Sequence, residues 1–207
     1  MSIMTIQTIK DSSMAWQQTN QMLVKEHLGL FKSASNYDIF GLASGEKLLQ
    51  CREPNLGWLT KALRFTDYRR MTPFDVHVTD TDGNLVVQVK RGISLLVSKV
   101  SVFDGSGRRL GGFNQKFFSI GGAFRVLDEH GSEVCQLSGK WTGWDFQFKA
   151  QGVQLARVTK KWQGLGKEMF TTADNYVLDI SEALPPESQT RKLILAAVMC
   201  IDMVLKE

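Results

Sequence analysis

The sequence predicts a mainly β protein: a closed antiparallel barrel of about twelve strands around a central hydrophobic helix at the C-terminus. Two features support this fold class, a turn motif that recurs at a fixed interval and a final segment that is apolar on every side. A meander of many short strands tends to close on itself, because closure removes exposed strand edges. A closed barrel of that size is too wide for its own side chains to fill. The final segment is therefore the expected filling.

The N-terminal part of the chain contains a polar tail and the first strands. Residues 1–15 are rich in Ser, Thr and Gln and are expected to form a flexible tail. Residues 16–207 are expected to form a single barrel domain. Within it, Trp16–Phe31 mixes apolar residues with Gln and Lys, which fits either a short helix or an edge strand. Tyr37–Phe40 and Lys47–Cys51 flank a glycine-containing stretch, which predicts a strand, a turn and a second strand.

A turn motif of the form Val-x-Asp-x-x-Gly occurs three times in the middle of the chain, each copy 24 residues after the last. The Asp side chain can accept a hydrogen bond from the backbone two residues on, and Gly accepts a positive φ. Each copy therefore predicts a tight hairpin turn, and apolar residues alternate on both sides as in strands with one buried face. A looser fourth copy centres on Gln151-Gly152. The three copies are Val78–Gly83, Val102–Gly107 and Val126–Gly131.

The final segment predicts the central helix at about residues 190–205. From Leu193 to Leu205 every residue except Asp202 is apolar or small. A helix that is apolar all round must be buried in protein or in lipid. The stretch is about 20 Å long, which is shorter than the roughly 30 Å core of a bilayer. Asp202 is a buried polar residue of this helix that needs a partner inside a barrel, whereas in lipid it would mark a functional site.

Composition limits the compartment and the partners. The chain has 207 residues, a net charge of +4 and three widely separated cysteines. These cysteines indicate neither a disulfide framework nor a zinc site, and with no signal-peptide pattern they favour a cytoplasmic location. The mild positive charge is compatible with an anionic partner such as lipid headgroups or nucleic acid. We find no nucleophile with a base, no paired catalytic carboxylates and no phosphate-binding glycine loop, so we expect no enzyme.

Two groups of residues are candidates for binding. Asp174, Asn175 and Asp179 supply oxygen ligands of the kind that calcium prefers, although an EF-hand spacing is missing and a strand with exposed acids is the alternative. A second group surrounds a tryptophan with basic residues, which suits a loop that binds lipid headgroups at a membrane surface. A surface hairpin with a packed tryptophan fits that group equally well. This candidate headgroup set is Lys160, Lys161, Trp162 and Lys167.

Several longer stretches of the chain carry a family resemblance. The most distinctive are Thr159–Gly164, Lys167–Tyr176 and Ile201–Glu207, and others precede them in order from about residue 20. Together they resemble the phospholipid scramblase family, in particular its compact bacterial members. The resemblance implies the Tubby C-terminal fold, a twelve-stranded barrel closed around a central hydrophobic helix.

The resemblance also implies a function. Eukaryotic members of the family are described as moving phospholipids between leaflets in a calcium-dependent way, and their proposed calcium segment corresponds to Thr172–Tyr176. The implied activity is therefore binding of anionic phospholipid with calcium-linked transbilayer movement. Because no Pro and no Cys precedes Cys51, lipid anchors are not expected, and attachment at the inner face of the plasma membrane would be peripheral. The alternative is a soluble Tubby-like module that binds lipid, protein or nucleic acid without moving lipid. The sequence leaves the oligomeric state open.

Overall fold

The computed structural model describes residues 14–27, 36–55, 57, 60, 72–93, 99–115, 124–140, 144–160 and 175–205. Within this range, the side chains of Gln115, Lys140 and residues 202–205 are not described. The described part contains a helical turn at residues 14–18, twelve strands and one long helix. The strands and the helix are β1 (Gln21–Glu26), β2 (Tyr37–Gly41), β3 (Lys47–Arg52), β4 (Phe74–Asp80), β5 (Leu85–Arg91), β6 (Lys99–Asp104), β7 (Arg109–Gln115), β8 (Phe124–Asp128), β9 (Glu133–Lys140), β10 (Asp145–Ala150), β11 (Val153–Thr159), β12 (Tyr176–Ile180) and α3 (Gln189–Leu205).

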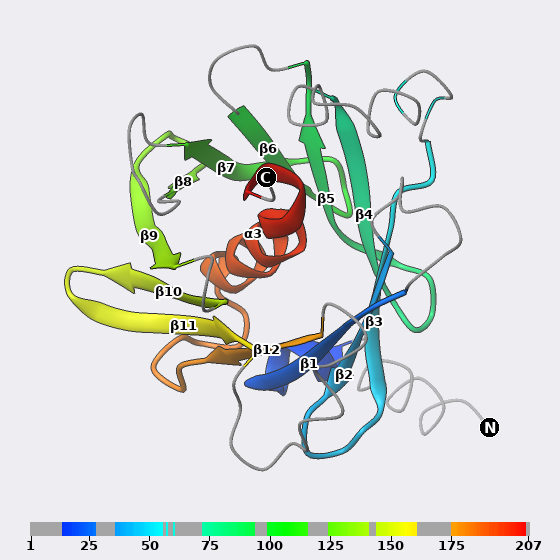
Figure 1. Ribbon diagram of the computed structural model, residues 1–207, viewed down its shortest axis with the longest axis vertical. Helices are drawn as coiled ribbons and strands as arrows, with labels where there is room; N and C mark the ends of the chain where they lie inside the picture. Colours follow the sequence, from blue (N-terminus) through cyan, green and yellow to red (C-terminus); the bar gives the residue numbers. More distant parts are fainter. Residues whose placement is uncertain are drawn as a thin grey trace.

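The strands form one closed antiparallel barrel. Each strand pairs with its neighbours in the chain, and β1 closes the circle because it pairs with both β2 and β12. Figure 1 shows the wall surrounding the helix, with β1 and β12 adjacent. The predicted fold class is therefore confirmed. The segment Trp16–Phe31, for which the sequence fits either a helix or a strand, contains both. A helical turn that includes Trp16 precedes β1.

The recurring turn motif has the same geometry in all three copies. Asp80, Asp104 and Asp128 each accept hydrogen bonds at one carboxylate oxygen from the backbone N–H groups two and four residues later. The glycine that ends each copy has a φ between 82° and 86°, a region that side chains with a Cβ rarely adopt. The fourth turn differs, because Gln151 and Gly152 both have positive φ and form a two-residue hairpin.

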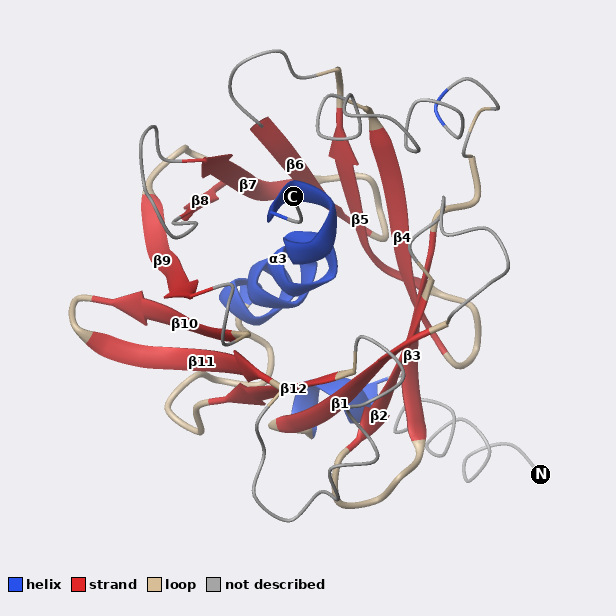
Figure 2. Cartoon of the chain, in the orientation of Figure 1, coloured by secondary structure: helices blue, strands red, loops and turns tan. Residues whose placement is uncertain are grey.

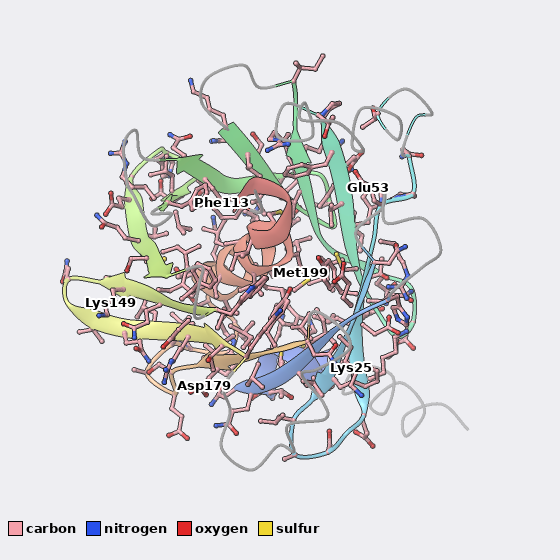
Figure 3. All side chains as sticks on the ribbon, viewed as in Figure 1. Lys25, Glu53, Phe113, Lys149, Asp179 and Met199 are labelled. Carbon is pink, nitrogen blue, oxygen red and sulfur yellow. The ribbon has the colours of Figure 1, made fainter. Side chains whose placement is uncertain are left out.

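The helix α3 runs through the middle of the barrel (Figure 2). Its residues 193–201 are all at most 6% exposed, so every face of the helix is covered by the wall. In Figure 3, Met199 lies on the helix and Phe113 on the facing strand β7. These nine consecutive side chains pack against the buried apolar residues of the strands and form one core with them. No helix in the described residues is both long and apolar enough to cross a membrane.

The buried Arg191 fixes the N-terminal end of α3. Its side chain is fully buried, and it donates hydrogen bonds to the Asn20 side-chain oxygen (2.9 Å) and to the carbonyls of Thr19 (2.8 Å) and Leu184 (3.3 Å). Burial lowers the pKa of Arg191, because a charged group loses its hydration there. Gln189 also donates to the Leu110 carbonyl at 2.6 Å. These contacts place the start of the helix beside the start of β1.

The two ends of the barrel differ. At the end where α3 begins, five pairs of successive strands are joined by connections of two to five residues; we call this the turn end. At the opposite end, where α3 terminates, the six connections have four to 21 residues; we call this the loop end. The connections of the loop end are residues 27–36, 53–73, 92–98, 116–123, 141–144 and 160–175.

Candidate functional site

Aromatic rings and a lysine gather at the loop end, where β10 begins and β11 ends. The Trp144 ring stacks on Tyr176 at a centroid distance of 5.8 Å and meets Phe146 edge-on at 6.0 Å. The Lys160 ammonium lies 4.1 Å from the centre of the Trp144 ring, close enough for a cation–π interaction. The Lys160 backbone N–H also donates to the Trp144 carbonyl at 3.2 Å. Lys160 and Tyr176 lie at the two ends of the connection between β11 and β12, which contains the candidate headgroup residues. The aromatic cluster therefore keeps these two ends together.

Near the same end, a lysine, an arginine and a histidine surround Asp38 on the outer face of β2. His27 lies 2.6 Å from one carboxylate oxygen, while Arg52 (2.7 Å) and Lys47 (3.0 Å) contact the other. Burial works to raise the pKa of Asp38, but hydrogen bonds with Arg52, Lys47 and His27 outweigh it and lower the pKa to about 2. Lys25 is in register with Asp38 on the neighbouring strand and lies 5.0 Å from the Phe40 ring centre. The single negative charge of Asp38 thus holds the two positive side chains of Lys47 and Arg52 in place.

The thiols lie inside the barrel. Cys51, Cys135 and Cys200 are free and buried. Burial raises the pKa of Cys135 to about 12 and raises those of Cys51 and Cys200 well above the ordinary value. A protonated thiol is a poor nucleophile and a poor metal ligand. These side chains therefore belong to the core, and in the described residues no group of three or more His, Cys, Asp or Glu side chains is arranged to hold a metal ion.

The structure places the candidate calcium residues apart from one another. Asn175 directly precedes β12, whereas Asp179 lies within that strand, opposite Arg157 in register. Four residues of strand span about 13 Å, which is too far for both side chains to reach one ion with oxygen ligands at about 2.3–2.6 Å. Asp179 instead adds to the negative charge around Arg157, whose pKa is raised chiefly by its two hydrogen bonds to Asp145. Asp174 lies outside the described residues.

The candidate headgroup residues belong to the 160–175 connection of the loop end. Of these, Lys160 is described and takes part in the aromatic cluster, while Lys161, Trp162 and Lys167 lie outside the described residues. Asp202 lies in the last turns of α3, which end at the same end of the barrel, and its side chain is not described. The strand topology therefore places Lys160, Asn175 and the end of α3 at the same end of the barrel.

Charge divides unequally between the two ends of the barrel, a feature that the sequence pattern alone does not indicate. The six connections of the loop end contain nine Lys or Arg and four Asp or Glu, a net charge of +5. The connections of the turn end, including residues 181–188 that lead into α3, contain one Arg and five Asp or Glu, a net charge of −4. The whole chain carries only +4. The signal was present in the sequence, but it becomes visible only when the strand order assigns each connection to an end.

The turn end also has a polar cavity of about 430 Å³. Trp16 and Lys192 line it together with Asp80 and Asp104. Both carboxylates already accept the backbone hydrogen bonds of their own turns. Their geometry is therefore explained by the hairpins, and the loop end remains the candidate site.

The described architecture defines the class of protein: a Tubby C-terminal-like barrel of twelve strands around a central helix. An X-ray structure of a protein from Arabidopsis thaliana has this fold as well, with a TM-score of 0.54 and 16% identity over 90% of this chain and 93% of that one. The Scramblase family model matches residues 14–207. The chain therefore belongs to the scramblase family.

A curated relative from Saccharomyces cerevisiae, altered inheritance rate of mitochondria protein 25, is 27% identical to the chain. The match covers 72% of this chain and 52% of the relative, so the chain spans about half the length of that protein. Membership of the family supports a scramblase-like or related function.

Proposed function

We propose that the protein binds anionic phospholipid headgroups with its loop end and attaches to a membrane surface peripherally, at the inner face of the plasma membrane. The observation that carries this proposal is the net charge of +5 on the loop-end connections against −4 at the turn end. A basic residue near an anionic membrane contributes about 1 kcal/mol. The same membrane repels the turn end, so the charge difference favours one orientation.

The aromatic cluster supports the same end as the contact surface. Tryptophan and lysine side chains suit the boundary between headgroups and acyl chains, because each combines an apolar body with a polar tip. Trp144 and Lys160 lie at the base of the connection with the sequence Lys161-Trp162. Lysines of this connection would meet lipid phosphate while the indoles rest at the interface.

The buried helix limits the mechanism. Insertion of α3 into a bilayer would remove the core from the barrel, since residues 193–201 are buried on every side. At about 25 cal/mol per Å² of apolar area, that loss would unfold the wall. We therefore infer that any effect on lipid movement arises from surface binding with α3 in place, and that the protein acts by binding rather than by catalysis.

Vesicle flotation tests the proposal. The protein is mixed with vesicles of phosphatidylcholine alone or with added phosphatidylserine, at increasing salt and with or without calcium. We expect binding that requires phosphatidylserine and weakens with salt, because screening shortens the range of the attraction. Lys99→Glu combined with Lys161→Glu reverses two charges of the loop end and should weaken binding at least about tenfold.

A matched control separates position from total charge. Arg109→Glu combined with Lys192→Glu makes the same change in net charge, with both residues near the turn end. We expect this control to bind within about twofold of the unmodified protein. Equal loss of binding in both double variants, or no phosphatidylserine dependence, would refute the loop-end site.

The same vesicles with a labelled lipid measure exchange between leaflets. Exchange above that of empty vesicles, with a further rise on adding calcium, would support calcium-linked lipid movement. Binding without exchange would support the second candidate, a module that binds lipid without moving it. If calcium changes neither binding nor exchange, the calcium role of Asp174 and Asn175 would be rejected for this protein.

A further inference from the structure

The barrel wall opens between β9 and the hairpin formed by β10 and β11. The two strands pair from Lys140 and Asp145 at the loop end to Gln136 and Lys149. Beyond that pair, β9 continues for residues 133–135; Glu133 and Cys135 pair with β8, and none of the three has a partner on β10 among the described residues. Figure 1 shows the β10–β11 hairpin diverging from β9 toward its tip. We call this opening the seam.

The seam is a cavity of about 380 Å³ with one charge on each side. Its apolar lining comes from small or medium side chains, Val134, Cys135 and Ala150. Glu133 lies on the β9 side, where it accepts a hydrogen bond from Gln136 at 2.7 Å and is 4.0 Å from the Arg125 guanidinium, and Lys149 lies on the hairpin side. Lys149 is exposed, has no ion-pair partner in the described part and is labelled on the hairpin in Figure 3. The cavity thus has a mixed apolar and polar lining, with a carboxylate on one side and an ammonium group on the other.

The tip of the hairpin lies beside the seam, and no described strand pairs with its outer edge at Val153 and Gln154. Pairing of β11 with β12 begins at Ala156, preceded only by a hydrogen bond from the Ser181 N–H to the Leu155 carbonyl. Gln154 lies one residue from the closing pair of the hairpin, so its backbone N–H and carbonyl face outward. Val153 is 57% exposed, one of two large apolar side chains with such exposure in the described residues. An unpaired edge with an exposed valine is a template for pairing with another chain.

We propose that the seam and the hairpin tip form a self-association surface, with the tip of one copy docked into the seam of a second copy about a two-fold axis. A two-fold interface requires a surface that is complementary to itself. Here the projecting element, Val153 at the tip, and the recess that accepts it are adjacent on one molecule. When the two copies dock about a two-fold axis, each hairpin tip fills the seam of the other copy. Lys149 of each copy then lies beside Glu133 of the other.

A second copy explains more of these features than a peptide from another protein. A peptide would fill the seam and pair with β9, but it would leave Val153 and the outer edge of Gln154 exposed. The second copy covers both. It also lies at the turn-end side of the wall, so it leaves the loop end free. This inference is independent of the proposed lipid binding, and either can fail without the other.

The test exchanges the two charges between copies. In Glu133→Lys the facing residues of a homodimer are Lys and Lys, and in Lys149→Glu they are Glu and Glu. Each single variant should therefore raise the dissociation constant of the dimer by about tenfold or more, since two like-charge contacts replace two ion pairs. A mixture of the two variants restores both ion pairs, so a heterodimer should form with nearly the affinity of the unmodified dimer. Analytical ultracentrifugation over a concentration series measures all three.

Val153→Lys tests the apolar contact and should also abolish the dimer. Its matched control is Ile93→Lys, since Ile93 is the other large exposed apolar residue, at 77%, and lies at the loop end. The control should dimerise like the unmodified protein, and thermal melting checks that each variant folds. A monomer at every concentration would overturn the proposal. So would single charge variants that dimerise normally, or a mixture that stays monomeric.

Discussion

The substitution Asp38→Asn tests the cation cluster on β2 most sharply, because it removes a charge and keeps the size of the side chain. Asp38 is 8% exposed and contacts His27, Lys47 and Arg52. Its pKa falls from 3.8 to about 2 in the folded protein. At about 1.36 kcal/mol per unit, the charged carboxylate stabilises the fold by about 2 kcal/mol near neutral pH.

The direction of the pH dependence follows from the lowered pKa. The folded protein holds its proton less tightly than the unfolded chain, so this stabilisation is present above pH 4 and disappears as the pH falls toward 2. Protonated Asp38 is then neutral and similar in shape to Asn. We expect the unmodified protein to be about 2 kcal/mol more stable than Asp38→Asn at pH 7 and the two stabilities to converge at low pH.

Urea unfolding followed by circular dichroism at a series of pH values measures this difference. Glu182→Gln is the control, since Glu182 is an exposed carboxylate in the segment before α3, and it should change stability by no more than about 0.5 kcal/mol. A difference between the unmodified protein and Asp38→Asn that stays constant from pH 7 to pH 3 would refute the ion-pair explanation.

Two further predictions concern the core and a close contact between the paired strands β6 and β7, and both are measured by urea unfolding. Leu195→Ala in the centre of α3 should cost about 2–5 kcal/mol, because Leu195 is fully buried, whereas Ile93→Ala at an exposed site should cost less than about 0.5 kcal/mol; similar losses would contradict a central helix. Gly112→Ala should cost about 2 kcal/mol or more through overpacking, since a Cβ there would meet the Val100 carbonyl oxygen at 2.2 Å. Gly83→Ala has free space and should cost only about 1 kcal/mol for its positive φ. Equal stability of Gly112→Ala and Gly83→Ala would show that the close approach of β6 does not require a glycine at position 112.

The sequence allowed prediction of those parts of the fold that depend on local chemistry. The Asp–Gly turns use hydrogen bonds within five residues, so the 24-residue repeat was enough to locate the hairpins. The apolar character of residues 193–205 likewise indicated a buried helix. The segment after Trp16 stayed ambiguous because β1 is held by β12, about 150 positions away in the chain. No local pattern reports such a partner.

The candidate site was less predictable for the same reason. The partners of Asp38 come from two other segments, His27 after β1 and both Lys47 and Arg52 in β3, and only the strand register brings them together. The spacing of Asn175 and Asp179 predicts either a calcium ligand set in a loop or a strand with exposed acids, and Asp179 lies in a strand. The opposite charges of the two ends also required the strand order. The family resemblance supplied the fold and the class of function, but it did not indicate which surface meets the lipid.

The orientation of the protein on a membrane is the most direct test of the loop-end site. Because Cys51, Cys135 and Cys200 are all buried, a single exposed cysteine can be labelled selectively with an environment-sensitive fluorophore. One variant carries the label at His27 of the loop end, and another carries it at Glu182 of the turn end. With vesicles that contain phosphatidylserine, we predict a blue shift of the label at position 27 and no change at position 182. A shift at position 182 alone, or equal shifts at both positions, would contradict it.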